Sequence, residues 1–178
     1  MKDLYFVRHG ETVVNTDKII CGSTDIELTE LGREEADALG LIFTYGGYGV
    51  QEIICSPLIR ARETAEIMSR RMRVPFRVDE RLREQSFGKY EGQPVDLAEF
   101  REAKRQFADS FEGGESTLRL AARVYPLLDE LGRDDRVYLI VAHSSVGRMI
   151  NSYFNDIKNK EYPKYRVKKC IIAKFQYK

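Results

Sequence analysis

The sequence contains no long hydrophobic run, no marked excess of one charge and no closely spaced cysteines. Every apolar run is shorter than the roughly 18 residues that a membrane-spanning helix requires. The start of the chain, MKDLYFVRHG, also lacks the apolar core of a secretory signal. These absences predict a cytoplasmic protein that does not bind membranes.

The formal charge is nearly balanced, with a net value of +1. Such a balance gives no general attraction for nucleic acid, so no nucleic-acid partner is expected. Any attraction for an anion must therefore come from a local cluster of side chains. A phosphate-binding loop ending in Gly-Lys-Ser or Gly-Lys-Thr is also missing, which argues against the common nucleotide-binding class.

The cysteines Cys21, Cys55 and Cys170 are odd in number and far apart. Their spacing fits neither a zinc site nor a redox pair, so we expect reduced, mostly buried thiols and no metal. A cysteine phosphatase is rejected as well. The spacing from Cys55 to Arg60 is one residue too short for that class, and Pro57 removes a backbone amide from the loop that would hold phosphate.

Strand-like and helix-like patterns alternate along the 178 residues. They predict one α/β domain, 1–178, built as a three-layer sandwich with helices on both faces of a mostly parallel central sheet. The predicted strands are 4–7, 51–55, 74–78, 137–142 and 171–175. The predicted helices are a segment capped by Thr29 that runs through 43, a segment that starts at Ser56 and Pro57, then 94–110, 116–131, and a segment to 154 capped by Ser144 or Ser145.

The residues that follow the predicted strands are the main functional signal. Arg8 and His9 follow the first strand, His143 follows the strand 137–142, and Arg60 lies in the first turn of the helix after the second strand. These histidines are the only two in the chain. In a parallel sheet the carboxyl ends of the strands meet at one edge, where ligands bind. We therefore expect the four side chains to converge.

Two arginines and two histidines near helix starts predict a pocket for a phosphate dianion. A neutral imidazole can attack phosphorus and form a phosphohistidine, while the arginines and a protonated second histidine stabilise the transferring group. A carboxyl group is then needed to protonate the leaving oxygen. Glu84, in the loop segment LREQSFGKYEG, is the candidate, although the chain has 28 acidic residues from which to choose.

Six blocks of the chain, in order, resemble the histidine phosphatase superfamily, whose fold is phosphoglycerate-mutase-like. They are VRHGET with Asn15, GSTDIELTELG, CSPLIRARETA, LREQSFGKYEG, FEGGES and VAHSSVGR. The resemblance implies that His9 is the nucleophile, that Glu84 is the proton donor, and that no metal or cofactor takes part. It also implies a phosphate pocket formed by Arg8, Asn15, Arg60 and a charged His143.

Other positions follow from the same resemblance. Cys21, Gly22 and Ser23 lie in a block similar to the family's substrate-contacting loop, with a passive role expected for the thiol. Ser144 stands where the family usually has glycine. If this position needs a positive φ, serine costs roughly 1 kcal/mol or more; if it does not, the Ser144 amide and hydroxyl can both face phosphate.

The resemblance favours a metal-independent phosphatase that acts on a small phosphomonoester. A phosphoglycerate mutase and a non-catalytic phosphoester-binding regulator remain alternatives. The mutases of this family have a longer middle region, and a regulator would lack His9 or Glu84. The sequence leaves the substrate and the oligomeric state open, with a dimer as one option.

Two charged segments have two interpretations each. Segment 94–113 is a candidate specificity or lid segment. Phe100, Phe107 and Phe111 are expected in the core, while Arg101, Lys104 and Arg105 either form a solvated face, which we favour, or overhang the pocket. The lysine-rich run 156–169 is expected to be a surface loop, with attraction of polyanionic substrates or weak RNA binding as its alternative functions.

Overall fold

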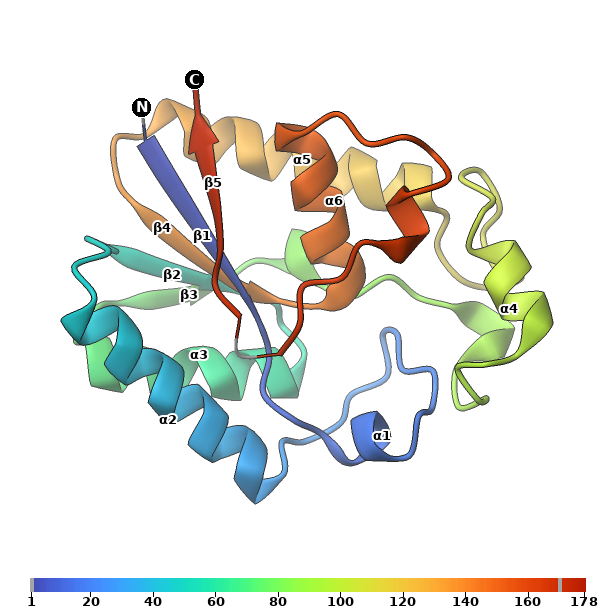
Figure 1. The fold of residues 1–178 in the computed structure, drawn as a ribbon, viewed down its shortest axis with the longest axis horizontal. Coiled ribbons are helices and arrows are strands. Elements are labelled where there is room, and N and C mark those ends of the chain that lie inside the picture. Colours follow the sequence, from blue (N-terminus) through green and yellow to red (C-terminus); the bar gives the residue numbers. More distant parts are fainter. Residues whose placement is uncertain (1, 170) are drawn as a thin grey trace.

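A five-stranded sheet forms the centre of the computed structural model, which describes residues 2–169 and 171–178 (Figure 1). The thiol predicted at Cys170 lies outside the described residues. The strand order is β3-β2-β4-β1-β5. The strands are β1 (Lys2–Arg8), β2 (Glu52–Cys55), β3 (Phe76–Val78), β4 (Tyr138–Ala142) and β5 (Ala173–Tyr177).

The sheet is parallel except at one edge, as predicted. The strands β3, β2, β4 and β1 run in the same direction, and only β5 pairs antiparallel, with β1. Two strands begin two residues later than expected, since β3 starts at Phe76 and β5 at Ala173. The neighbouring strands β1 and β4 pair Arg8 with Ala142, so the residues that follow them start from the same level of the sheet.

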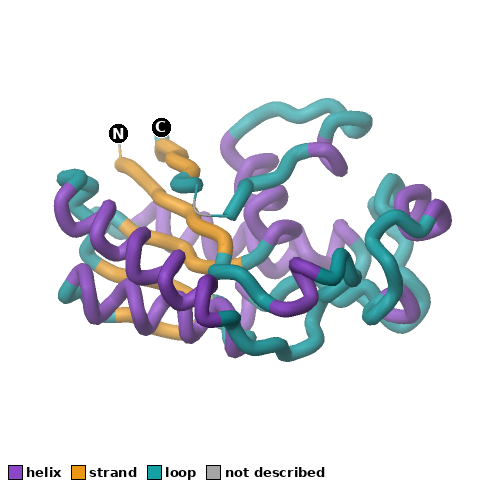
Figure 2. The backbone as a smooth tube through the Cα atoms, turned by 60° about the horizontal axis from the view of Figure 1, so that its bottom comes forward, coloured by secondary structure: helices purple, strands orange, loops and turns teal. Residues whose placement is uncertain are grey.

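Helices cover both faces of the sheet, as the tube in Figure 2 shows. Along β1, Leu4 and Phe6 face one core and Tyr5 and Val7 face the other, because successive side chains of a strand point to opposite faces. The first core packs against α5 and α6, and the second against α2 and α3. The helices are α1 (Val13–Thr16), α2 (Glu30–Tyr45), α3 (Ile59–Met72), α4 (Ala98–Ala103), α5 (Thr117–Arg133) and α6 (Ser144–Phe154), with short 3-10 helices at Glu80–Leu82, Gly88–Tyr90 and Tyr162–Lys164.

The predicted cap of α2 is confirmed, and α5 has a cap of the same kind. The Thr29 hydroxyl accepts a hydrogen bond from the Gly32 amide at 3.0 Å, and the Ser116 hydroxyl accepts one from the Arg119 amide at 3.2 Å. Both bonds satisfy an amide of the first helical turn that has no partner within the helix.

The predicted caps of α3 and α6 are wrong. Helix α3 begins at Ile59, and the carboxylate of Asp25 accepts from the Ile59 amide at 2.7 Å. Ser56 instead lies against His143. In α6 the cap position is occupied by His143, and Ser144 is the first helical residue. In both helices a carboxylate from a distant part of the chain satisfies a first-turn amide, which local sequence cannot reveal.

The helix predicted over 94–110 is also wrong, because only Ala98–Ala103 is α-helical. Phe100 and Phe111 pack with Phe87 in a separate small core, with ring centroids 5.1 and 5.3 Å from that of Phe87. Phe107 packs on Tyr162 instead, at 5.3 Å, against the core of α5 and α6. The chain must bend to supply two cores, and Phe111 has a positive φ of 57°.

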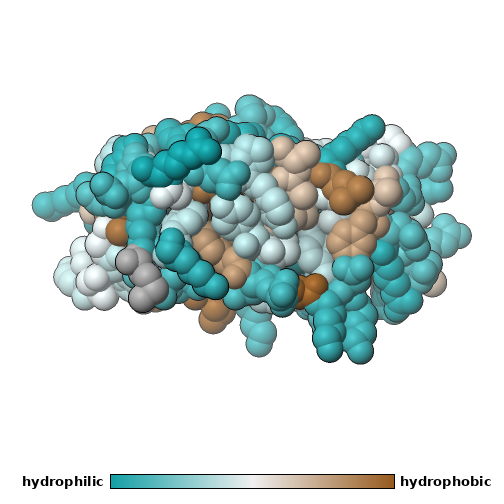
Figure 3. Space-filling model, turned by 90° about the horizontal axis from the view of Figure 1, so that it is seen from above, coloured by the Kyte–Doolittle hydropathy of each residue, from teal (hydrophilic) through white to brown (hydrophobic). Residues whose placement is uncertain are grey.

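The outer surface is mostly hydrophilic on the face shown in Figure 3, where apolar side chains form small separate areas. Within the described residues, we find no helix with the length and apolar character needed to span a bilayer.

Candidate active site

The carboxyl ends of three neighbouring strands bring the predicted residues together. His9 follows β1, Ser56 follows β2 and His143 follows β4. The backbone amide of His9 donates to the carbonyl of Ala142 at 3.0 Å, so parallel pairing continues up to the site. The ring centroids of His9 and His143 lie 5.1 Å apart. The convergence predicted from strand order is therefore observed.

His9 is buried and its ring is held in one tautomer. Its Nδ1 lies 2.8 Å from the carbonyl oxygen of Gly10. A carbonyl can only accept a hydrogen bond, so Nδ1 carries the proton and Nε2 has a free lone pair. Burial lowers the pKa of His9 well below 6.5, and the charges of Arg8 and Arg60 lower it further. The ring is consequently neutral, as a nucleophile must be.

Gly10 is required by a close backbone approach. A Cβ at this position would lie 2.2 Å from the carbonyl oxygen of Gly32, and a Cβ at Gly32 would lie 2.2 Å from that of Glu11. The start of α2 thus packs directly on the loop that follows β1. The Gly10 amide donates to the Thr64 hydroxyl at 3.1 Å, which links the loop to α3 as well. Packing from two helices therefore holds His9 in place.

His143 is fully buried beside His9, and it is not among the described residues that line the cavity. Its Nε2 lies 2.7 Å from the Ser56 hydroxyl, while its Nδ1 has no hydrogen-bond partner among the described residues. Burial lowers the pKa of His143 well below 6.5, with further lowering by Arg60 and His9. The structure thus favours a neutral His143, contrary to the charged form that was expected. A phosphate dianion beside the ring would raise its pKa.

Arg8 and Arg60 are the two predicted guanidinium groups, and both line the same cavity. The Nε of Arg8 is buried without a hydrogen-bond partner within the described chain. Arg60 is 2% exposed and donates to the carbonyl oxygens of Gly22 and Thr24, each at 2.8 Å. Carbonyl oxygens position the Arg60 cation without neutralising it, so its charge remains available for an anion.

Gly22 and Ser23 differ from their predicted role as substrate contacts, because neither is among the described residues that line the cavity. The Gly22 carbonyl holds Arg60. The Ser23 amide donates to the carboxylate of Glu91 at 3.0 Å, and the Thr24 amide donates to the same group at 3.1 Å. At these positions the loop contacts Arg60 and Glu91.

Glu91 is a residue that the sequence analysis missed. Its carboxylate accepts from the amides of Ser23, Thr24 and Phe87 and from the side chains of Ser23, Ser86 and Thr24. Burial opposes ionisation of Glu91, but the hydrogen bonds from Thr24, Ser23 and Phe87 prevail and lower its pKa. Its place in FGKYEG was the only available signal, and that block was used to select Glu84.

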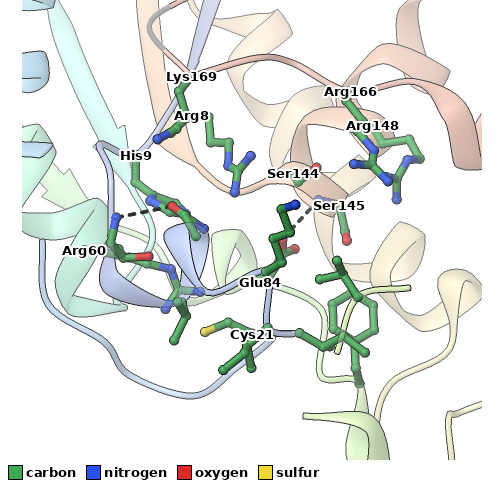
Figure 4. Close-up of a pocket in the computed structure, with 18 of the residues that line it drawn as sticks. Arg8, His9, Cys21, Arg60, Glu84, Ser144, Ser145, Arg148, Arg166 and Lys169 are labelled. Carbon is green, nitrogen blue, oxygen red and sulfur yellow. Dashed lines mark hydrogen bonds between the residues drawn. The ribbon is translucent and has the colours of Figure 1, made fainter. Parts of the chain in front are cut away.

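Glu84 is 5% exposed and lies at the N-terminus of α6 (Figure 4). One carboxylate oxygen accepts from the Gln85 amide at 2.9 Å, and the other accepts from the Ser145 amide at 3.1 Å. Ser144 lines the cavity beside it and is not among the described residues with a positive φ. The serine at this position, where the family usually has glycine, therefore causes no backbone strain.

Asn15 and Cys21 also line the cavity. The side-chain oxygen of Asn15 accepts from the Thr12 amide at 3.3 Å, so it stabilises the start of α1. The thiol of Cys21 donates to the Thr24 carbonyl, and burial raises its pKa. A raised pKa keeps the thiol protonated, which agrees with the passive role that was expected.

The cavity has a volume of about 350 Å³ and a strongly basic lining. Five further basic residues line it from outside the predicted phosphate pocket: Lys18, which follows α1, Lys104, which follows α4, Arg148 of α6, and Arg166 and Lys169 of the segment before β5. Lys169 is paired with Glu11 at 2.9 Å. The favoured solvated face is right for Arg101 and Arg105, which are exposed, but wrong for Lys104.

Clusters of three or more His, Cys, Asp or Glu side chains that could hold a metal ion are not found in the described part of the chain.

The sequence model of the histidine phosphatase superfamily, branch 1, matches residues 4–178. A curated relative described as probable phosphoglycerate mutase GpmB, from Yersinia pestis (strain Pestoides F), is 29% identical over 187 residues. The match covers 99% of this chain and 86% of the relative.

Solved structures give the same comparison in three dimensions. The native structure of a mycobacterial glucosyl-3-phosphoglycerate phosphatase is 28% identical, with a TM-score of 0.84, and the match covers 97% of this chain and 89% of that one. An alpha-ribazole phosphatase from Shigella flexneri is 23% identical, with a TM-score of 0.80, and the match covers 97% of this chain and 89% of that one. At this identity the similarity shows the shared fold alone. The predicted phosphoglycerate-mutase-like α/β fold is confirmed.

Proposed function

The chain belongs to the histidine phosphatase superfamily, and we propose that it hydrolyses a small phosphomonoester through a phosphohistidine intermediate, without a metal. The observation that carries this proposal is the state of His9. A neutral ring, with Nδ1–H bonded to Gly10 and Nε2 unprotonated, is placed beside the Arg8 and Arg60 guanidinium groups. A nucleophile and two phosphate-binding cations are thereby combined.

In the first step, Nε2 of His9 attacks phosphorus, so that a P–N bond forms as the P–O bond to the leaving group breaks. Arg8 and Arg60 stabilise the charge on the equatorial oxygens. The partnerless Nδ1 of His143 can take part once it is protonated, and Asn15 and Ser144 can donate hydrogen bonds from the cavity wall. Glu84, as a carboxylic acid, donates its proton to the leaving oxygen.

In the second step, water attacks the phosphohistidine. The Glu84 carboxylate takes a proton from this water, the P–N bond breaks, and phosphate leaves with His9 neutral again. Glu84 is suited to both steps because backbone amides fix its two oxygens at the cavity wall. The chemistry is balanced without a co-reactant other than water.

A phosphoglycerate mutase is the second candidate, because curated relatives at 29% identity carry that description. A mutase would return the phosphoryl group to the substrate and not to water. Hydrolysis is favoured here because the middle region is short and because the similar solved structure at 28% identity is titled a phosphatase. Measuring isomerisation and hydrolysis of 3-phosphoglycerate in the same reaction separates the two.

The test is phosphate release from a panel of phosphomonoesters in the presence of EDTA, with His9→Ala as the control. We expect hydrolysis by the native protein, a phosphoenzyme trapped by a rapid alkaline quench, in which the P–N bond is stable, and loss of both in the variant. Full turnover by folded His9→Ala protein would refute the nucleophile. Isomerisation well above hydrolysis would replace the phosphatase with the mutase.

A further inference from the structure

A second group of cations lies in the cavity apart from the phosphate-binding residues. Arg148 and Arg166 are side by side on the side of Glu84 that faces away from His9 and Arg60 (Figure 4). Lys104, the residue that follows α4, lines the same cavity, and its charge interacts with those of both arginines. We call Lys104, Arg148 and Arg166 the distal cation cluster.

The cluster has no carboxylate partner. Among the described residues, none of its three side chains forms an ion pair within 4.0 Å, although 13 other lysines and arginines do. Arg148 is 3% exposed and makes a single hydrogen bond, from Nε to the Tyr165 carbonyl at 3.1 Å. Its other guanidinium nitrogens therefore remain available at the cavity wall.

Grouping like charges is unfavourable, most of all where they are buried, and in this cluster Arg148 is buried and Lys104 half-buried, while Arg166 is exposed. Burial, followed by the charges of Arg148 and Arg166, lowers the pKa of Lys104 to about 7, and Glu84 opposes this effect only in part. Burial likewise lowers the pKa of Arg148. Buried charges without partners normally cost stability, so their presence at a cavity is best explained by an anion that binds there.

Two of the three side chains are also held in position by aromatic rings. The Lys104 ammonium lies over the rings of Phe87 and Phe100, at 5.9 and 5.1 Å from the centroids. The Arg148 guanidinium lies over the ring of Tyr162, at 5.5 Å. A surface lysine or arginine would move freely, whereas this pair is fixed by aromatic contacts before any ligand arrives.

We propose that the distal cation cluster binds a second anionic group of the substrate while Arg8, His9 and Arg60 bind the phosphoryl group that is transferred. The substrate is then a small phosphomonoester that also carries a carboxylate or a second phosphate. This inference rests on the proposed function and narrows its substrate class. The apolar side chains Phe87, Phe100 and Ile20, which also line the cavity, contact the carbon skeleton between the two anionic groups.

The experiment compares two ligands that differ in one group. The first is 3-phosphoglycerate and the second is glycerol 3-phosphate, in which a hydroxymethyl group replaces the carboxylate. Affinities are measured by calorimetry and kcat/KM by phosphate release. We expect the carboxylate to raise both by about ten-fold or more, since charge-assisted hydrogen bonds are the strong ones. Fructose 1,6-bisphosphate against fructose 6-phosphate tests a second phosphate in the same way.

The variants are Lys104→Met and Arg166→Met, which keep an apolar stem and remove the charge. Arg101→Met is the matched control, because Arg101 is on α4, three residues before Lys104, but is exposed and is not among the described residues that line the cavity. We expect each of the first two variants to lower the ratio of kcat/KM for 3-phosphoglycerate to kcat/KM for glycerol 3-phosphate, and to lower the corresponding ratio of affinities. The control should behave as the native protein does.

Equal affinity of the native protein for both members of both pairs would overturn the proposal, as would an unchanged preference in Lys104→Met and Arg166→Met. These outcomes are distinct from failure of the proposed function. A binding preference without any turnover would refute the phosphatase activity and support anion binding by the distal cation cluster. Turnover of all four esters without a preference would support the phosphatase activity and refute anion binding by the cluster.

Discussion

Glu91→Gln tests how the loop 22–24 positions Arg60. The carboxylate accepts hydrogen bonds from backbone amides through both of its oxygens. If the new NH2 group takes the place of Oε1, it faces the amides of Ser23 and Phe87, and if it takes the place of Oε2, it faces that of Thr24. In either orientation a donor meets a donor, so the isosteric change cannot preserve the network.

The expected magnitude follows from these contacts. The milder orientation loses one charge-assisted bond and weakens the others, which amounts to roughly 2–4 kcal/mol when each bond to a charged group contributes about 1.5–3 kcal/mol. A loss of about 2 kcal/mol lowers Tm by about 4–8 °C in a chain of this size. The carbonyls of Gly22 and Thr24 then no longer fix Arg60, and displacement by about 1 Å can reduce kcat/KM about 100-fold.

The assay is kcat/KM for an aryl phosphate, measured below the onset of thermal unfolding, together with the affinity for inorganic phosphate. Glu99→Gln is the control, since Glu99 is an exposed glutamate on α4. Thermal destabilisation alone, with kcat/KM and phosphate affinity of the folded protein unchanged, would refute the positioning of Arg60 by Glu91.

Two further predictions concern proton transfer and pH. Glu84→Gln should slow hydrolysis of alkyl phosphates by about 10²–10⁴-fold and that of aryl phosphates much less, because only a poor leaving group needs the proton; equal slowing of both would contradict the role of Glu84 as the acid. Because the pKa values of His9 and His143 are lowered, kcat/KM should not decrease through protonation of the nucleophile as the pH is lowered through 6.5. A titration of the His9 ring at pH 6.5, as for a free imidazole, would contradict this. Because of the same shifts, the unfolded chain binds more protons than the folded chain below pH 6.5. The free energy of unfolding should therefore decrease as the pH is lowered below 6.5, by up to about 1.4 kcal/mol per pH unit for each histidine. This pH dependence should be weaker in His9→Ala.

Local patterns were sufficient for most of the architecture. Apolar runs and cap residues placed the strands β1, β2 and β4 and the helices α2 and α5, because burial in a sheet and capping by the adjacent residue depend on near neighbours in the sequence. They failed over 94–110, where helical spacing of Phe100, Phe107 and Phe111 did not mean one helix face. Two cores compete for these rings, and that competition is a property of the folded chain.

The candidate site divides in the same way. The sequence was sufficient to select four residues, Arg8, His9, Arg60 and His143. Each lies at or just after the carboxyl end of a parallel strand, and these ends meet at one edge of the sheet. Asn15 and Glu84 needed the family resemblance, since nothing in their local spacing separates them from a turn residue and a solvated charge.

Only the tertiary structure decided the charge state of His143, the tether from Glu91 to Arg60, and the distal cation cluster. Each depends on burial and on charges that come from distant segments. Glu91 contacts the loop 22–24, nearly seventy residues away in the sequence, and the cluster combines the residue after α4 with residues of α6 and of the segment before β5. Desolvation and Coulomb interactions act through space, so their effect on a side chain can be worked out only once its neighbours are known.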